Sequence, residues 1–137
     1  MNITYKQVPP RLHMQVKDLL NALGIHNEDP LNIHFGLLAS KHSVCAYDVN
    51  DNGEEKLIAI ARALDDTCYN AYLDYVIIHP DYRHKKIATE ICTQLIASLK
   101  DVTHIYAAPE TEELEKFYEY LGFEKKGCRM IYNKKSQ

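Results

Sequence analysis

The sequence has no long apolar run and no excess of charge of one sign, and each absence narrows what the chain can do. No uninterrupted apolar segment reaches the roughly 20 residues that a membrane-spanning helix requires. The N-terminal residues also lack the apolar core of a secretory signal peptide. The net charge is −3, so no overall basic balance indicates nucleic acid as a partner. These features favour a cytoplasmic protein that binds neither membranes nor nucleic acid.

Clustered metal or disulfide ligands are absent too. The four cysteines are far apart and no two form a C-x-x-C pair, so reduced thiols are expected in place of disulfides or a zinc site. The seven histidines are scattered, and we assign no metal. The motifs G-x-x-x-x-G-K-[ST] and G-x-G-x-x-G are missing, which leaves a nucleotide-binding protein as a minor alternative.

What is present is the composition of a globular domain. The chain has 137 residues, of which 46% are hydrophobic and 26% charged. That length suits one domain with one core, over residues 1–137. The local patterns predict seven strands and four helices. We expect the strands at 2–8, 43–49, 56–64, 72–78, 104–108, 123–126 and 129–133, and the helices at 12–23, 30–40, 86–99 and 110–120.

The most informative stretch is a strand, a basic turn and a helix. Residues 72–78 are rich in β-branched and aromatic side chains, and Pro80 ends the strand. The helix carries Ile87, Ile91 and Leu95 on one stripe. Free N–H groups and the dipole of a helix N-terminus favour anions, so the basic turn between the two elements is a candidate phosphate site. The other interpretation is a solvated charged turn.

The two N-terminal helices have clear apolar positions. In the first, Leu19 and Leu23 belong to an amphipathic stripe. In the second, Asp29 and Pro30 read as N-cap and first helical residue, and the pattern places three apolar side chains inward. These three are Leu31, Phe35 and Leu38.

Two charged residues interrupt apolar strand faces. Arg62 shares a face with Ile60, and it either snorkels at a sheet edge or lines a site. Asp74 is either solvated at the open end of its strand or accepts a proton from a substrate ammonium. Alternation places Asp74 on one face with Tyr72, Val76 and Ile78.

Two motifs resemble those of one family. Residues 76–88, V-I-I-H-P-D-Y-R-H-K-K-I-A, resemble motif A of the GNAT superfamily of acyl-CoA-dependent N-acyltransferases, which reads Arg/Gln-x-x-Gly-x-Gly/Ala. Arg83 matches the first position and Ala88 the last, whereas Lys86 replaces the usual Gly. A Lys fits there if its φ is negative and its side chain points away from the pyrophosphate. Residues 117–123, F-Y-E-Y-L-G-F, resemble the later signature F-Y-x-x-L-G-F.

The resemblance covers roughly the last two-thirds of the chain and implies a fold. We expect an α/β, GNAT-like fold with a mixed, twisted sheet of about six to seven strands and helices on both faces. In this family the central strands splay apart and the acyl-CoA arm bonds to main-chain groups in the gap. The two N-terminal helices border the acceptor groove there, although covering the sheet accounts for most of their residues.

The resemblance also implies site residues. Tyr118 would be the general acid for the departing thiolate, although core packing explains the same residue. Asp74 lies one residue from the position where the family often has an acid, which is Tyr75 here. Thr111 falls where the family often has an Asn near the pantetheine arm. The expected acyl-CoA contacts are Val76, Ile77, Ile78, Arg83, His84, Lys85, Lys86, Ile87, Ala88, Thr89 and Thr111.

The implied function is an N-acetyltransferase. It would move an acetyl group from acetyl-CoA, without a metal, to a primary amine of a small molecule or peptide in a ternary complex. Small members of the family are often homodimers, so a homodimer stays open. The alternative is a catalytically idle acyl-CoA-binding or interaction domain, motivated by Lys86 and by the offset of Asp74.

Overall fold

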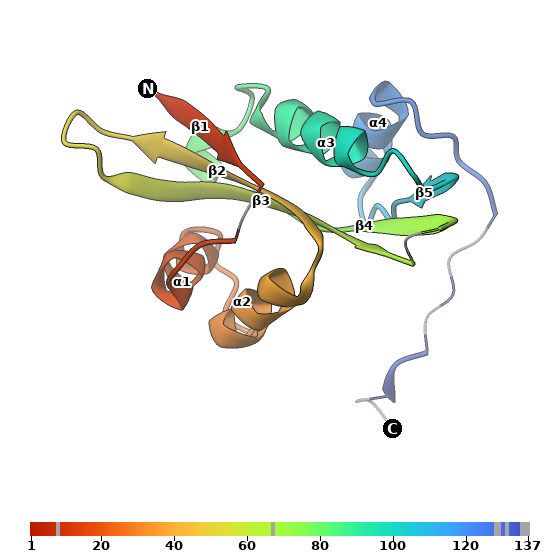
Figure 1. Ribbon diagram of the computed structural model, residues 1–137, viewed down its shortest axis with the longest axis horizontal. Helices are drawn as coiled ribbons and strands as arrows, with labels where there is room; N and C mark the ends of the chain where they lie inside the picture. The colour runs from red at the N-terminus through yellow and green to blue at the C-terminus, as the bar shows by residue number, and fades with distance from the viewer. Residues whose placement is uncertain (8, 67, 128–129, 131, 135–137) are drawn as a thin grey trace. The chain divides into compact units, whose positions relative to one another are not determined.

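A computed structural model of the chain divides into two compact units, Met1–Tyr106 and Ala107–Gln137 (Figure 1). We describe each unit by itself, and the expected single domain over 1–137 stays a prediction. The structure describes residues 1–7, 9–66, 68–127, 130 and 132–134.

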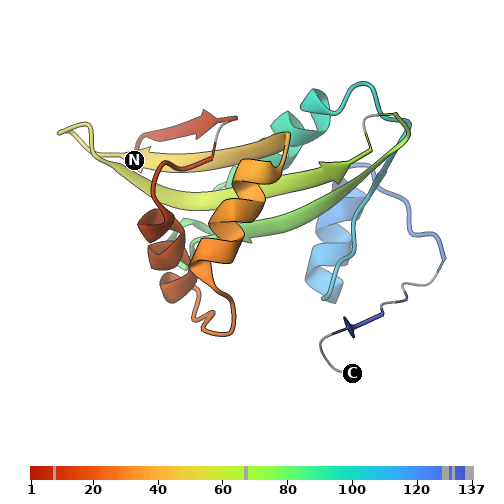
Figure 2. The same cartoon turned by 60° about the horizontal axis from the view of Figure 1, so that its bottom comes forward.

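The first unit is built on a mixed sheet with the order β1-β2-β3-β4-β5. Neighbouring strands from β1 to β4 are antiparallel, whereas β5 is parallel to β4. Helices α1 and α2 cover one face and α3 covers the other (Figures 1 and 2). The strands are β1 (Ile3–Lys6), β2 (His42–Val49), β3 (Glu55–Asp65), β4 (Asn70–Ile78) and β5 (His104–Tyr106), and the helices are α1 (His13–Ala22), α2 (Pro30–Ala39), the 3-10 turn η1 (Pro80–Tyr82) and α3 (Ile87–Ser98). The α/β class with helices on both faces is confirmed.

The core lies on both sides of β2 and β3. On the side of α1 and α2, Leu19 and Leu37 pack in one cluster with Cys45 and Ile60. Burial of each such side chain contributes about 1.5–3 kcal/mol. On the other side, the apolar stripe predicted for α3 is buried, namely Ile87, Ile91 and Leu95. Small side chains of β3 are buried as well, namely Ala59, Ala61 and Ala63.

The inward face of α2 differs from the expected one. Leu31, Phe35 and Leu38 are exposed, and the buried residues of α2 are Ile33, His34 and Leu37. The helix is apolar on nearly all sides, so its periodicity does not single out one face. The start of α2 is as predicted, because the Asp29 carboxylate accepts a hydrogen bond from the Leu31 N–H at 2.9 Å.

The sheet has five strands in the described part of the chain, so the expected six to seven is wrong. Residues 123–126 form no strand there, because Glu124, Lys125 and Lys126 are exposed and offer a sheet little apolar surface. Lys125 instead pairs with Glu115 at 2.9 Å. The last expected strand, 129–133, includes residues 129 and 131, which lie outside the described residues.

The second unit contains α4 (Glu112–Tyr120). The Thr111 hydroxyl accepts a hydrogen bond from the Leu114 N–H at 3.1 Å and so caps the helix. Gly122, with a φ of 106°, follows the last turn. Among the residues described in the two units, no helix combines the length and apolar character needed to cross a bilayer.

Candidate functional site

The basic turn between β4 and α3 has an unusual backbone. His84 and Lys86 both have a φ of 61°, in the left-handed region. That conformation costs a non-glycine residue about 1–2 kcal/mol. The condition of a negative φ at Lys86 is therefore not met: Lys86 adopts the conformation that a Gly takes at little cost. The chain keeps the course of a glycine-containing turn without the Gly.

The start of α3 can receive an anion. Lys86 is its N-cap residue, and no side chain among the described residues caps this end. The first N–H groups of a helix have no partner within the helix, and the dipole places partial positive charge there. These groups belong to Ile87, Ala88 and Thr89. The exposed basic side chains of the turn add positive charge next to them: Arg83, His84, Lys85 and Lys86. This arrangement has the chemistry of a phosphate site.

A hydrogen bond fixes the start of this turn to the sheet. The Tyr82 hydroxyl donates to the Asp48 carboxylate on β2, which raises the pKa of Tyr82 to about 12 and lowers the pKa of Asp48. The His79 Nδ1 accepts a hydrogen bond from the Asp81 N–H at 3.1 Å, and the His79 ring meets the Tyr82 ring edge-on. The sequence interpretation missed this arrangement, although a charged Asp48 late in an apolar strand was a signal.

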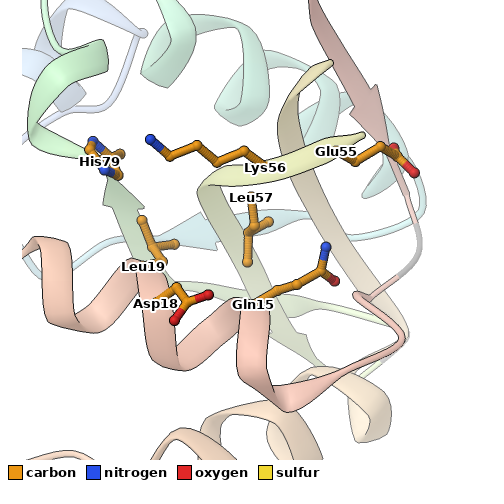
Figure 3. Close-up of a pocket in the computed structure, with 7 residues that line it drawn as sticks. All are labelled: Gln15, Asp18, Leu19, Glu55, Lys56, Leu57 and His79. Atoms are coloured by element: carbon orange, nitrogen blue, oxygen red, sulfur yellow. The ribbon is translucent and has the colours of Figure 1, made fainter. Parts of the chain in front are cut away.

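A pocket of about 240 Å³ lies beside these residues, between α1, the start of β3 and the end of β4. In Figure 3, the Lys56 and His79 side chains extend toward each other above Leu19 and Leu57. Burial, and then the charge of Lys56, lowers the pKa of His79, so its ring is neutral near pH 7. The pocket is lined by Gln15, Asp18, Leu19, Glu55, Lys56, Leu57 and His79. None of these is a predicted site residue.

A bulge divides β4 into two parts. Ile77 is in register with Ile60, and Asp74 is in register with Arg62, so β4 has one residue more than β3 between these pairs. Tyr75 lies at the bulge with a φ of 53°. The expected alternation of Asp74 with Val76 and Ile78 is therefore wrong. Beyond the bulge it is Ile77 that packs against the cluster under α1 and α2.

Arg62 and Asp74 form an ion pair across β3 and β4. Arg62 is 8% exposed, whereas the Asp74 side chain is 43% exposed. The Arg62 guanidinium lies 4.6 Å from the centre of the Tyr75 ring, and Asp74 Oδ1 accepts a hydrogen bond from the Tyr75 N–H at 3.1 Å. A Cβ atom on Gly36 of α2 would lie 2.5 Å from Arg62 Nη1. Arg62 is therefore buried beneath α2, where Gly36 leaves room for it, and it is not an edge residue.

The edge of β4 that faces β5 is open over most of its length. β5 pairs with β4 only from Asn70 to Tyr72. Beyond Tyr72, this edge has no strand partner among the described residues. The main-chain groups of Val76, Ile77 and Ile78 on this edge therefore have no strand to pair with among the described residues, and the chain runs on from them into the basic turn.

The other two predicted site residues lie in the second unit. Tyr118 is 8% exposed, and its ring lies 5.5 Å from that of Phe117 and 5.4 Å from that of Phe123, measured between centres. Core packing of Tyr118 is thus observed, and its role as a general acid stays a prediction. Thr111 is the N-cap of α4, and its contact with a pantetheine arm also stays a prediction. Within the described residues, no group of three or more His, Cys, Asp or Glu side chains is arranged to hold a metal ion.

The fold is that of known acetyltransferases. The structure is similar to that of a GNAT-family acetyltransferase from Streptococcus pneumoniae TIGR4, with a TM-score of 0.77 and 22% identity over 97% of this chain and 99% of that chain. It is also similar to AAC(6')-Iy in complex with the bisubstrate analogue CoA-S-monomethyl-acetylneamine, with a TM-score of 0.71 and 18% identity over 98% and 99% of the two chains.

Residues 13–123 match the Acetyltransferase (GNAT) family, and the chain belongs to this family. It is 36% identical over 76 residues to the uncharacterized N-acetyltransferase ycf52 of Gracilaria tenuistipitata var. liui, a match that covers 53% of this chain and 40% of that protein. It is 32% identical over 91 residues to the histone acetyltransferase TAP1 of Glycine max, a match that covers 64% of this chain and 39% of that protein. The matches thus span well under two thirds of these relatives.

Proposed function

We propose that the chain is an N-acetyltransferase that transfers the acetyl group of acetyl-CoA to a primary amine by direct attack in a ternary complex. The observation that carries the proposal is that the part of β4 without a strand partner is followed, after the basic turn, by the uncapped start of α3. An extended thioester arm can bond along the strand edge while its phosphates reach the helix N-terminus. The similar structure of AAC(6')-Iy holds a CoA-containing analogue, which supports the choice of ligand.

The predicted acyl-CoA contacts of the first unit have two parts in this proposal. The pantetheine arm bonds to the main chain of Val76, Ile77 and Ile78, so the side chains of those residues matter little. The phosphates meet the N–H groups at the start of α3 and the charged turn. The residues of that second set are Arg83, His84, Lys85, Lys86, Ile87, Ala88 and Thr89.

The reaction needs orientation and two proton transfers. The ammonium loses a proton, the amine nitrogen attacks the acetyl carbon, the C–N bond forms, the C–S bond breaks and the CoA thiolate takes a proton. Asp74 holds the ammonium and accepts its proton, directly or through water, and Tyr118 protonates the thiolate. The bulge leaves Tyr75 and Val76 without register partners on β3. The Tyr75 N–H donates to Asp74, so the Val76 N–H is the donor that we assign to the acetyl carbonyl.

The alternative, an idle acyl-CoA-binding domain, has two motives. The first is Lys86, which stands in place of the motif Gly and takes a left-handed φ of 61°, so this motive remains. The Arg62–Asp74 ion pair keeps the other motive alive, because Asp74 is already engaged. Calorimetry with acetyl-CoA, combined with a thiol-release assay over a broad amine panel, separates the two. Tight binding of acetyl-CoA without turnover of any amine would favour the idle domain.

Tyr118→Phe tests the assignment of the general acid. The change keeps the packed ring and removes the hydroxyl, so we expect kcat to fall by about 10²–10⁴-fold with little change in acetyl-CoA affinity. Steady-state kinetics with any accepted amine gives the answer. Tyr120→Phe, on the exposed side of the same helix, is the matched control. Near-wild-type kcat in both variants would leave Tyr118 a packing residue.

A further inference from the structure

Three adjacent strands expose large side chains at one end of the sheet. The Tyr72 and Tyr106 rings, from β4 and β5, are stacked with their centres 5.2 Å apart and their planes at 26°. They are 53% and 43% exposed, and Leu64 of β3, in register with Tyr72, is exposed as well. We call these three residues the aromatic platform. Exposed apolar groups gathered in one place often mark a binding surface.

The aromatic platform adjoins the candidate acceptor site. Tyr72 and Asp74 are in register with Leu64 and Arg62, which are two residues apart on β3. All four side chains therefore lie on the same face, the one covered by α1 and α2 further along. Two residues along a strand separate Tyr72 from Asp74 by roughly 7 Å.

The charge on this face favours a cation. The guanidinium of the Arg62–Asp74 pair is buried, while its carboxylate is half exposed, so the end of the pair that faces solvent is negative. Glu28, in the loop between α1 and α2, contributes to the same region. Burial raises the pKa of the Tyr75 phenol; the charges of Glu28 and Asp74 raise it further, and the charge of Arg62 lowers it. A ligand for this face thus combines a flat apolar group with a positive charge.

We propose that the acceptor is a primary amine joined by a short chain to a planar aromatic ring, with the ring on Tyr72 and Tyr106 and the ammonium at Asp74. This inference rests on the proposed acetyltransferase function. The backbone positions of Tyr72 and Asp74 are roughly 7 Å apart along β4, a spacing that suits a linker of about two or three carbons. The ring stacks on the platform, and the amine undergoes the transfer described above to give an N-substituted acetamide and free CoA.

The test compares amines with and without a ring in a thiol-release assay. The probes are 2-phenylethylamine, n-propylamine and 1,4-diaminobutane. Wild type should show a kcat/KM about ten-fold higher for 2-phenylethylamine than for either of the others. Tyr72→Ala and Tyr106→Ala should each raise KM for 2-phenylethylamine several-fold and leave the kinetics of n-propylamine unchanged. Tyr69→Ala removes an exposed Tyr just before β4 and should change neither.

Several results would overturn the inference alone. These are equal kcat/KM for ring and alkyl amines, a preference for the diamine, or equal losses for all amines in the platform variants. Size-exclusion chromatography adds another: a dimer that Tyr72→Ala dissociates would place a second copy on the platform instead. Binding of acetyl-CoA with no turnover of any amine would instead overturn the proposed function, and the inference with it. Thermal unfolding of each variant checks that it is folded.

Discussion

The basic turn and the β4 bulge both place non-glycine residues in the left-handed conformation. They differ in their charges, which are paired at the bulge and exposed at the turn. At the bulge, the Tyr75 ring packs against the buried Arg62 guanidinium, and that guanidinium pairs with the Asp74 carboxylate, although its Nε has no hydrogen-bond partner among the described residues. At the turn, the strained His84 and Lys86 carry exposed charges of one sign. Strain of this kind persists at functional sites. The bulge pairs its cation with a carboxylate of the protein, whereas the turn presents exposed positive charge, and this difference supports the anion proposed at the turn.

Arg62→Ala should have the largest effect on stability. It leaves Asp74 without its partner and empties the space beneath α2, so we expect a loss of about 2–3 kcal/mol in the free energy of unfolding. Arg83→Ala, at the exposed turn, should stay within about 0.5 kcal/mol of wild type. Urea denaturation of both variants measures the contrast. Equal losses would mean that the two charged regions do not differ as described.

Arg83→Glu should have the opposite effect to Arg62→Ala: it should weaken CoA binding and change the free energy of unfolding little. Reversing one charge beside the expected phosphates should weaken CoA binding by about ten-fold or more. Calorimetry with CoA measures the change. Arg11→Glu makes the same substitution at another exposed position and should leave CoA affinity as it is. Unchanged affinity in a folded Arg83→Glu variant would move the donor site elsewhere.

Lys86→Gly separates strain from charge within the turn. The Gly relieves the left-handed conformation, which should raise the free energy of unfolding by about 1 kcal/mol. The lost ammonium should mildly weaken CoA binding and reduce its salt dependence. Thermal unfolding and calorimetry at two salt concentrations measure both. His84→Gly relieves the same strain and is the control for stability. Tighter CoA binding by Lys86→Gly would show that the Lys obstructs the site.

Tyr82→Phe should give the smallest effect, visible as a pH dependence. The Asp48 bond raises the pKa of Tyr82 to about 12, so its contribution is full below about pH 10 and is lost as the pH rises toward 12. The same bond lowers the pKa of Asp48, so the contribution is also lost as the pH falls below about 4. Wild type should thus be more stable than Tyr82→Phe only between these limits, as measured by thermal unfolding across pH. A difference constant from pH 3 to 12 would contradict this.

The parts of the fold that the sequence predicted depend on local chemistry. Pro80 and the apolar periodicity of α3 are signals within one segment, and so is the pair Asp29-Pro30 at the start of α2. The inward face of α2 was not predictable in this way. The helix is apolar on nearly all sides, so the residue that packs against it decides which side is buried. That neighbour is Arg62, which requires Gly36 opposite it.

The same distinction applies to the candidate site. The motif located the basic turn, since its residues are consecutive. The ion pair of Arg62 with Asp74 joins two strands, and the bulge at Tyr75 shifts the register by one residue, which strict alternation does not reveal. Sequence reasoning therefore located the basic turn and missed how Arg62, Asp74 and Tyr75 are arranged.

The open edge of β4 has a consequence for handling the protein. Beside Val76, Ile77 and Ile78, which are apolar and β-branched, this edge has no strand partner among the described residues, so a strand of another molecule can add to it. In the proposed complex, the pantetheine arm occupies the same edge. Bound CoA would then prevent aggregation through this edge. A concentrated sample kept without CoA should therefore precipitate sooner than one kept with it.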